Sequence, residues 1–458
     1  MPDSKKQVTV SEKPLSKIFK AYDVRGIYPS DIDEKTCENI GGAFATFLGC
    51  KEVIVGTDMR VSSPALSRAF MKGCNEAGAD VIDIGQVSTD GTYFASGFLG
   101  KPAVMFTASH NPRDYNGMKF SREKAVPING DTGLQEIKAI IEKNQYKKSQ
   151  KKGKTIKKDI LPDYVKHVHS FIDLKSLKKL KIAVDAGNGM AGKVVPLVYE
   201  KLAPKILPLY FELDGNFPNH PADPSKFENL KDLQAKVRKE KADFGMAFDG
   251  DADRIFFADE KGEVVNSSLI SALICKNMLG KNAGAKIIHN AVTSRIVPDT
   301  IKKFGGKVVI ERVGHSFIKD TMRKTGAVFA CEHSAHYYFR DNFNADSGII
   351  ASVIVSDIVS KEGKKLSGLL DEFRVYATME ETNFEVKDKK KKMNEIEKHY
   401  KKMGAQISKL DGVSVAFDDY WFNVRPSNTE PLLRLNMEAL ESNILDKKMK
   451  EITKIIKK

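Results

Sequence analysis

The chain is poor in cysteine, and the few cysteines present are not paired. Its five are an odd number without a CxxC pair, at Cys37, Cys50, Cys74, Cys275 and Cys331. A disulfide framework or a thiolate zinc site needs paired or closely spaced cysteines, so the sequence argues against both. We expect these thiols to be buried or idle.

Long apolar stretches are also missing. No segment approaches the roughly 18 to 20 uninterrupted apolar residues of a membrane helix. The polar N-terminus, MPDSKKQVTVSEK, lacks the apolar core of a signal peptide. We therefore expect no membrane partner and a cytoplasmic location. With 41% hydrophobic residues in a length of 458, the chain is long enough for about three or four globular domains.

Positive charge is plentiful, but it is unevenly distributed. The formal net charge is +14, and three lysine-rich runs at 147–158, 387–392 and 446–458 carry +7, +4 and +4, so the remainder is close to neutral. Such runs are usually solvated linkers, loops or helix faces. None is interleaved with the aromatic residues on which a single-strand binder stacks bases. We expect no nucleic-acid partner.

Short β-rich apolar runs alternate with helix-length amphipathic segments, a pattern typical of α/β domains. The pattern restarts after the lysine-rich linker at 147–158 and again after a predicted hairpin at 254–265. We predict a helix at 62–78 and strands at 52–56, 81–85, 103–107, 181–186, 206–212, 242–249, 286–290, 307–313 and 327–332.

The predicted fold class is α/β, with three related α/β domains that have mixed sheets and a smaller C-terminal α+β domain. The predicted boundaries are 1–155, 156–256, 257–370 and 371–458.

The first chemical motif is TASHNP (107–112), directly after a predicted strand. Ligands of α/β sheets bind at strand ends, and Pro112 prevents regular structure from continuing, so Ser109 is predicted on an exposed, constrained loop. A serine there is either a nucleophile or only a turn or capping residue. The motif alone does not separate these possibilities.

The second motif, DGDADR (249–254), places Asp249, Asp251 and Asp253 at alternate positions after an apolar strand. Repulsion among three clustered carboxylates is costly without a cation, and a small number of hard oxygen ligands suits Mg²⁺. A calcium loop is excluded, because its sixth position should be glycine and is Arg254, and because the residues that follow predict a strand.

Two further motifs suit the binding of a phosphorylated sugar. RPSNTEPLLR (425–434) brackets short hydrogen-bonding residues between two arginines, which suits a phosphate, although a proline-rich turn with surface arginines is the alternative. EHSAH (332–336) combines an acceptor with a hydroxyl, as a polyol-binding loop does. Its two histidines would also suit zinc, but no third ligand at zinc-like spacing accompanies them.

One motif points to a different function. GNGMAG (187–192) is a GxGxxG between a predicted strand and a predicted helix, and Glu212 ends the next predicted strand, as a dinucleotide-binding fingerprint requires. An NAD-dependent oxidoreductase that uses Gly187, Gly189 and Gly192 is therefore one alternative. A structural tight turn is the other.

Taken together, the motifs resemble the α-D-phosphohexomutase superfamily, most closely its phosphomannomutase/phosphoglucomutase branch. The resemblance implies three related domains and a smaller fourth around a central cleft, and a glycine-rich turn in the second domain that does not bind NAD. It rests on AYDVRGIYP (21–29), TASHNP (107–112), DGNFPNH (214–220), DGDADR (249–254), VGHS (313–316), EHSAH (332–336) and RPSNTEPLLR (425–434).

The resemblance implies a role for each residue at a matching position. Ser109 resembles the family's phosphoserine, and the three aspartates with the seryl phosphate resemble its Mg²⁺ ligands. Lys119 is the implied general acid or base, and Arg25 and Arg254 are implied electrostatic stabilisers beside His110. The implied sugar and phosphate ligands are His315, Glu332, Ser334, Arg425, Ser427, Asn428, Thr429 and Arg434.

The implied reaction is an intramolecular phosphotransfer that interconverts hexose 1-phosphate and hexose 6-phosphate. Phosphoserine passes its phosphoryl group to the sugar, and the resulting 1,6-bisphosphate turns over in the cleft and returns its other phosphate to Ser109. The expected cofactors are Mg²⁺ and a hexose 1,6-bisphosphate activator. The expected partner is a small phosphosugar, and the chain is expected to be a monomer or a homodimer.

Two positions depart from the family pattern. Where its sugar-binding loop usually has glycine, this chain has Cys331 and Ala335, and a backbone angle that favours glycine would be strained there. The histidine in Glu332-His333-Ser334 favours the mannose/glucose branch over phosphoglucosamine mutase, which is the alternative within the superfamily.

Overall fold

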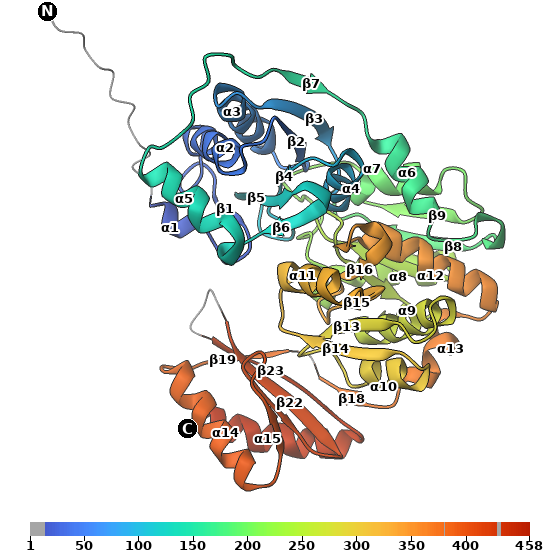
Figure 1. Cartoon of the computed structure of the whole chain (residues 1–458). Helices are drawn as coiled ribbons and strands as arrows, with labels where there is room; N and C mark the ends of the chain where they lie inside the picture. Colours follow the sequence, from blue (N-terminus) through green and yellow to red (C-terminus); the bar gives the residue numbers. More distant parts are fainter. Residues whose placement is uncertain (1–13, 380, 428–431) are drawn as a thin grey trace, which may run out of the picture. The chain divides into compact units, whose positions relative to one another are not determined.

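The computed structural model describes residues 14–379, 381–427 and 432–458 (Figure 1). These residues form two compact units: unit 1 contains residues up to 265 together with 336–366, and unit 2 contains 266–335 and the residues from 367 onward. Each unit holds strands of more than one sheet, so the four predicted domain boundaries stay a prediction. No helix in the described part of the chain has the length and apolarity needed to cross a membrane.

Unit 1 begins with a mixed sheet in the order β1-β5-β4-β2-β3-β7, with β6 beside β5. β2 is parallel to β3 and β4, whereas β5 is antiparallel to β1 and β4. The strands are β1 (Val24–Ile27), β2 (Glu52–Thr57), β3 (Asp80–Gln86), β4 (Ala103–Phe106), β5 (Tyr115–Arg122), β6 (Val126–Ile128) and β7 (Thr155–Lys157). The helices are α1 (Leu15–Ile18), α2 (Glu34–Leu48), α3 (Ser63–Glu76), α4 (Thr89–Leu99) and α5 (Gln135–Glu142).

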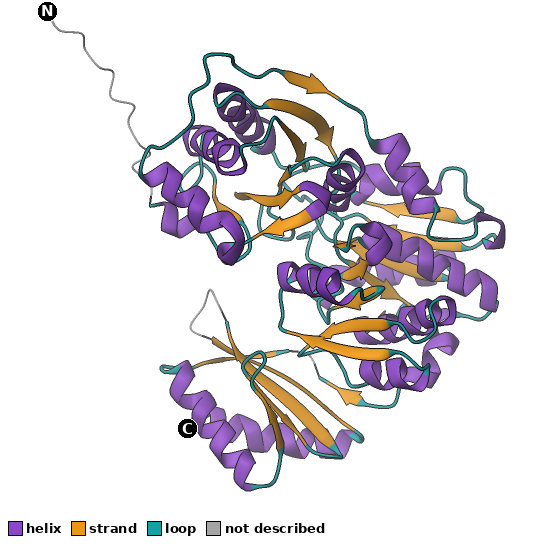
Figure 2. Cartoon of the chain, in the orientation of Figure 1, coloured by secondary structure: helices purple, strands orange, loops and turns teal. Residues whose placement is uncertain are grey.

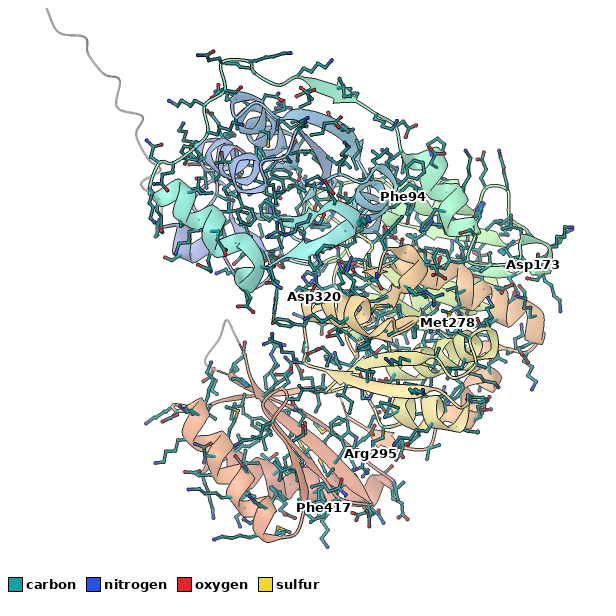
Figure 3. All side chains as sticks on the ribbon, viewed as in Figure 1. Phe94, Asp173, Met278, Arg295, Asp320 and Phe417 are labelled. Carbon is teal, nitrogen blue, oxygen red and sulfur yellow. The ribbon has the colours of Figure 1, made fainter. Side chains whose placement is uncertain are left out.

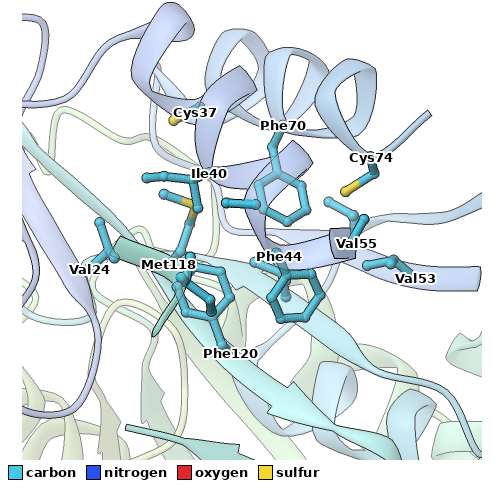
Figure 4. Packing of buried hydrophobic residues seen from close by; sticks show 14 of the residues in the cluster. Val24, Cys37, Ile40, Phe44, Val53, Val55, Phe70, Cys74, Met118 and Phe120 are labelled. Carbon is cyan, nitrogen blue, oxygen red and sulfur yellow. The ribbon is translucent and has the colours of Figure 1, made fainter. Parts of the chain in front are cut away.

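The core of this domain lies between the sheet and helices α2 and α3 (Figure 4). Phe44 of α2 packs against Phe70 of α3 and Phe120 of β5, with ring centroids 5.9 Å and 5.3 Å apart. Burial of each such side chain stabilises the fold by about 1.5 to 3 kcal/mol. Cys37 and Cys74 are buried in the same core, which confirms the prediction for these two thiols.

The second sheet of unit 1 has the order β12-β11-β10-β8-β9. β10 is parallel to β8 and antiparallel to β11, and β11 and β12 form the hairpin that the sequence predicts. The strands are β8 (Lys181–Asp185), β9 (Lys205–Leu209), β10 (Phe244–Phe248), β11 (Ile255–Ala258) and β12 (Val264–Val265). Unit 1 also holds α6 (Leu161–His169), α7 (Ala191–Tyr199), α8 (Lys231–Glu240), α12 (Gly348–Glu362) and the antiparallel pair β16 (Tyr337–Phe339) and β17 (Ala345–Asp346).

Unit 2 begins with parallel strands in the order β14-β13-β15. The elements of this part are α9 (Ser267–Lys281), β13 (Lys286–Asn290), α10 (Ile296–Lys303), β14 (Lys307–Glu311), α11 (His315–Thr325) and β15 (Phe329–Cys331). α13 (Leu366–Leu370) then leads to the C-terminal domain.

The C-terminal domain has an antiparallel sheet in the order β18-β23-β22-β21-β20, with β19 beside β23. Helices α14 and α15 lie along one face of that sheet and bury Ile396, Tyr400 and Ile452 against it (Figure 2). The elements are β18 (Ala377–Thr378), β19 (Thr382–Glu385), α14 (Lys389–Lys402), β20 (Gln406–Ser408), β21 (Val413–Ala416), β22 (Tyr420–Pro426), β23 (Leu432–Ala439) and α15 (Ser442–Lys457).

Arg295 joins the two parts of unit 2. It precedes α10, and its Nη2 donates to the carbonyl oxygen of Phe417 at 2.7 Å, while its backbone N–H donates to Glu438 Oε1 at 2.7 Å (Figure 3 labels Arg295 and Phe417). These hydrogen bonds of Arg295 connect the C-terminal sheet to the α/β part of unit 2.

The fold class predicted from the sequence is confirmed: three α/β domains precede a smaller domain with an antiparallel sheet. One detail of the prediction is wrong. The lysine-rich segment at 147–158 is not only a linker, because Thr155–Lys157 forms β7 parallel to β3. The other two lysine runs lie largely on α14 and α15 and are helix faces, as expected.

Candidate active site

The two loops that the sequence singles out in unit 1 meet at Ser109. TASHNP (107–112) follows β4, and DGDADR (249–254) follows β10. Ser109 has a φ of 49°, in the left-handed region, and its Oγ donates to Asp249 Oδ2 at 2.7 Å. A Cβ at Gly250 would lie 2.6 Å from the Ser109 carbonyl oxygen, so only glycine fits where the two loops cross.

Ser109 is constrained, as the sequence predicts, but it is not exposed. Its backbone N–H donates to Thr107 Oγ1 at 2.9 Å, and only 3% of the residue is exposed. The prediction of an exposed loop is wrong because the loop after β10 covers the serine, a contact between segments about 140 residues apart in sequence.

Asp249, Asp251 and Asp253 converge as the alternate spacing predicts. Each offers an oxygen within 4.8 Å of the others, and all three are buried. Lys119 Nζ donates to Asp251 Oδ2 at 2.8 Å and to Asp253 Oδ2 at 2.5 Å. Asp251 Oδ1 is buried and has no hydrogen-bond partner among residues 14–379, 381–427 and 432–458. Hard, buried oxygen donors with one of them unsatisfied fit a small divalent cation.

The ionisation of this cluster reflects its burial. Burial, together with the neighbouring carboxylates of Asp253 and Asp251, raises the pKa of Asp249 well above its usual range. Burial would also raise the pKa of Asp253, but Lys119, His336 and Arg254 together outweigh that effect and hold the pKa well below its usual range. The carboxylates therefore hold the pKa of Lys119 well above its ordinary value, although burial opposes this.

The other predicted cations and the histidine also lie at this site. Arg254 Nε is 3.7 Å from Asp249 Oδ2, and Arg25 Nη1 donates to Asn111 Oδ1 in the serine loop at 2.7 Å. His110 Nδ1 lies 3.1 Å from Ser109 Oγ. The nearby Arg254, then burial and Arg25, lower the pKa of His110 well below its ordinary value, so its imidazole is neutral at neutral pH. Unit 1 thus brings together every predicted catalytic and metal-binding residue.

Arg60 is a buried residue at the serine loop that the sequence motifs do not reveal. It is 1% exposed, and its guanidinium donates to four carbonyl oxygens of the segment that carries Ser109, at 2.7 to 2.9 Å. Its Nε lies 3.3 Å from the buried carboxylate of Asp58, and its guanidinium stacks 5.2 Å from the ring centroid of Phe217. The DGNFPNH motif (214–220) therefore braces the arginine that shapes the serine loop.

His336 and Asp346 also lie beside the aspartates. His336 Nε2 accepts a hydrogen bond from Arg254 Nε at 3.2 Å and lies 3.5 Å from Asp253 Oδ1. Asp346 Oδ2 is 4.0 Å from the same nitrogen, so Asp253, His336 and Asp346 form a second group with possible metal ligands. The sequence indicates His336 only through its place in EHSAH (332–336), the predicted polyol-binding loop.

The GxGxxG segment is explained by packing. Gly187 has a φ of 51°, a Cβ at Gly189 would lie 2.7 Å from the Gly250 carbonyl oxygen, and a Cβ at Gly192 would lie 2.2 Å from that of Phe211. The turn therefore packs directly against the DGDADR loop. Glu212 does not end a strand, because β9 ends at Leu209, so the acidic residue is not at the strand end where a dinucleotide site needs it.

In unit 2, Glu332 follows β15 and is buried. Its Oε1 accepts hydrogen bonds from Asn290 Nδ2 at 3.1 Å and from the backbone N–H of Gly314 at 3.2 Å, so it is held beside His315, the first residue of α11. Ser334 lies two residues further along the same turn.

Only one of the two departures from the family pattern lies at a strained angle. Ala335 has a φ of 64°, in the left-handed region, where a side chain costs about 1 to 2 kcal/mol. Cys331 is the last residue of β15 and is extended and buried, so a glycine is not needed there.

The second predicted group of unit 2 lies on β22 and β23. Arg425 and Arg434 are directly opposite one another in the antiparallel register, and Ser427 is buried just after β22. Asn428 and Thr429 lie outside the described residues. Glu381, which no motif indicated, accepts hydrogen bonds from both arginines at 2.9 Å and 3.0 Å.

Models of one protein family match nearly the whole chain. The matching models describe phosphoglucomutase/phosphomannomutase α/β/α domain I at residues 16–148, domain II at 162–262, domain III at 266–376 and the C-terminal domain at 381–455.

Two curated relatives and one solved structure agree with this match. A phosphomannomutase of Vibrio cholerae is 41% identical over 454 residues, which cover 96% of this chain and 98% of that protein. A phosphomannomutase of Escherichia coli K12 is 39% identical over 430 residues, which cover 92% and 94%. The crystal structure of a phosphoglucomutase/phosphomannomutase family protein from Burkholderia thailandensis matches with a TM-score of 0.89 and 31% identity, and covers 96% of this chain and 97% of that one.

Proposed function

Because this chain belongs to the phosphoglucomutase/phosphomannomutase family of the α-D-phosphohexomutase superfamily and is a phosphohexomutase, we propose that it interconverts the 1-phosphate and 6-phosphate of mannose or glucose through a phosphoserine at Ser109. The observation that carries the proposal is the hydrogen bond from Ser109 Oγ to Asp249, inside a buried cluster of three carboxylates. A reactive hydroxyl beside a site for a divalent cation is what phosphoryl transfer requires.

Asp249, Asp251 and Asp253, together with the seryl phosphate, would hold Mg²⁺. When bound, the ion supplies positive charge that stabilises the oxygens of the transferring phosphoryl group. Arg25 and Arg254 add fixed positive charge from the protein. The chemistry of the donors and the family match support these roles.

Ser109 gives up its phosphoryl group in the first half of the reaction and regains one in the second half. A hydroxyl oxygen of the hexose phosphate attacks the phosphorus of phosphorylated Ser109, so a new O–P bond forms and the P–Oγ bond breaks. The hydroxyl loses a proton and Oγ gains one. Lys119, which its carboxylate neighbours keep protonated, is the candidate acid that gives Oγ its proton, and the neutral imidazole of His110 beside Oγ is the candidate acceptor of the hydroxyl's proton. The bisphosphate then reorients and returns its other phosphate to Ser109 by the reverse chemistry.

The remaining predicted residues would recognise the substrate. Glu332, Ser334 and His315 would read the sugar hydroxyls, and Arg425, Ser427, Asn428, Thr429 and Arg434 would hold the phosphate that is not reacting. The 1,6-bisphosphate activator that the resemblance implies and the cytoplasmic location expected from the sequence are parts of this proposal.

Replacing the nucleophile tests the proposal most directly. Ser109→Ala is expected to lower the conversion of mannose 1-phosphate to mannose 6-phosphate by at least about 10³-fold. Ser121→Ala is the matched control, because Ser121 is buried in the same domain and its Oγ donates to the Ala103 carbonyl oxygen. Near-normal activity of Ser109→Ala would show that the phosphoserine is misassigned.

A second arm compares mannose, glucose and glucosamine 1-phosphates, each with and without Mg²⁺ and glucose 1,6-bisphosphate. Turnover that needs Mg²⁺ and prefers mannose or glucose supports the assignment. A preference for glucosamine 1-phosphate would move the chain to the phosphoglucosamine mutase alternative.

A further inference from the structure

Glu381 lies at the centre of the arginine pair of unit 2. Its Oε2 accepts from Arg425 Nη2 at 2.9 Å and from Asn436 Nδ2 at 3.0 Å, and its Oε1 accepts from Arg434 Nη1 at 3.0 Å. His333 Nε2 lies 3.9 Å from Oε2. One carboxylate thus engages two arginines, an amide and a histidine of the sugar-recognition turn.

The positions of the two arginines explain why a carboxylate lies between them. Arg425 and Arg434 face one another across β22 and β23, and like charges at directly opposed positions of an antiparallel pair repel. The negative charge of Glu381 between them cancels part of that repulsion. Burial would raise the pKa of Glu381, but Arg425, His333, Asn436 and Arg434 lower it, so the group is ionised at neutral pH.

A carboxylate and a phosphate offer arginine the same feature, two oxygens that match the guanidinium fork. Glu381 therefore accepts hydrogen bonds from the same two arginines that, in the proposed function, bind a phosphate of the substrate. The pair of arginines with Glu381 has a charge of +1 instead of +2, so it attracts a phosphate dianion less strongly than the arginines alone would.

We propose that Glu381 is a positioning residue that holds Arg425 and Arg434 between binding events and weakens their hold on the phosphate that is not reacting. This inference rests on the proposed function, in which the bisphosphate must release that phosphate in order to turn round. The carboxylate takes back the arginines as the phosphate leaves, so release does not leave two opposed cations unpaired.

The test is a calorimetric titration of the full chain with inorganic phosphate. Removing the negative charge in Glu381→Gln is expected to lower the Kd for phosphate about tenfold, because the amide still accepts a hydrogen bond but no longer repels the anion. Glu381→Asp keeps the charge and is expected to stay near the wild-type Kd. Glu385→Gln is the matched control, since it removes the same charge from the exposed end of β19, the strand that Glu381 immediately precedes.

Steady-state kinetics give a readout that a purely structural role would not produce. Glu381→Gln is expected to lower both KM and kcat for hexose 1-phosphate, because phosphate is bound more tightly and released more slowly. An unchanged or higher Kd for phosphate in Glu381→Gln would overturn the inference. Trp421, the only tryptophan of the sequence, lies on β22, so its fluorescence checks that each variant is folded.

The two proposals fail differently. A wild-type chain without mutase activity would refute the proposed function, whatever its affinity for phosphate. An active wild-type chain whose phosphate affinity does not respond to Glu381→Gln would refute only the inference about Glu381.

Discussion

The serine site of unit 1 and the arginine site of unit 2 both place opposite charges in contact, but they differ in burial. The side chains of Lys119 and Asp253 are 8% and 3% exposed, whereas those of Arg434 and Glu381 are 32% and 21% exposed. Water reaches the second group of charges much more easily than the first.

This difference matters because burial decides what a charge pair contributes. In a buried network the loss of one partner leaves an uncompensated charge in a low dielectric, which is costly. In a half-exposed pair water replaces the lost partner, so the pair contributes little to stability and exchanges readily. The serine site thus suits fixed positions for bond making, and the arginine site suits binding and release.

The largest effect is expected at Arg60, on the buried side of the comparison. Arg60→Met should destabilise unit 1 by about 3 to 5 kcal/mol, because Asp58 is left buried without its counter-ion and four carbonyl oxygens lose their donor. Urea unfolding followed by far-ultraviolet circular dichroism measures this change.

The double variant Asp58→Asn with Arg60→Met is its control. It removes the unpaired charge, so it should recover part of the stability but not the activity, because the Ser109 loop still lacks its donor. If Arg60→Met were as stable as the wild type, burial would not determine how much the Arg60–Asp58 pair contributes to stability.

The sequence predicts the elements around the site well, because each depends on a local pattern. Alternating apolar runs predicted β2, β3, β4, β8, β10 and β13. The spacing of Asp249, Asp251 and Asp253 predicted their convergence, since alternate residues of a short loop after one strand cannot lie far apart.

Residues whose role depends on distant segments were missed. Arg60 acts on carbonyls about 50 residues away in sequence, and Glu381 acts on β22 and β23. Neither belongs to a local pattern. The GxGxxG segment shows the converse case, because a local pattern that fits dinucleotide binding arises from close packing under the loop of Gly250.

The second prediction concerns Asp90, a buried carboxylate of unit 1 with no cationic partner among the described contacts. It accepts hydrogen bonds from the hydroxyls of Ser88, Tyr164 and Ser347. Burial raises its pKa from 3.8 to about 6, and these hydrogen bonds offset part of that rise. The folded state therefore binds the proton more tightly than the unfolded state does.

The contribution of Asp90 to stability is thus fully present below about pH 4 and is lost as the pH rises to about 6, by about 3 kcal/mol. Asp90→Asn cannot ionise, so its free energy of unfolding relative to wild type should rise by that amount between pH 4 and pH 7. Urea unfolding at several pH values measures it. A difference that does not vary with pH would contradict the raised pKa.

The smallest change in stability is expected at Arg434, on the half-exposed side. Arg434→Lys keeps the charge but loses the planar fork that meets Glu381, and it should alter the stability of unit 2 by no more than about 1 kcal/mol, as read from Trp421 fluorescence during urea unfolding. Its affinity for inorganic phosphate should fall about tenfold, because a lysine cannot make two parallel hydrogen bonds to the anion.

The same replacement at the buried site completes the test. Arg60→Lys also keeps the charge, but one ammonium cannot reach four carbonyl oxygens and Asp58 at once, so it should destabilise unit 1 by several times more than Arg434→Lys destabilises unit 2. Equal costs at the two positions would mean that burial does not separate the sites. A large loss of stability with unchanged phosphate binding in Arg434→Lys would mean that this arginine holds the sheet together and does not bind the substrate.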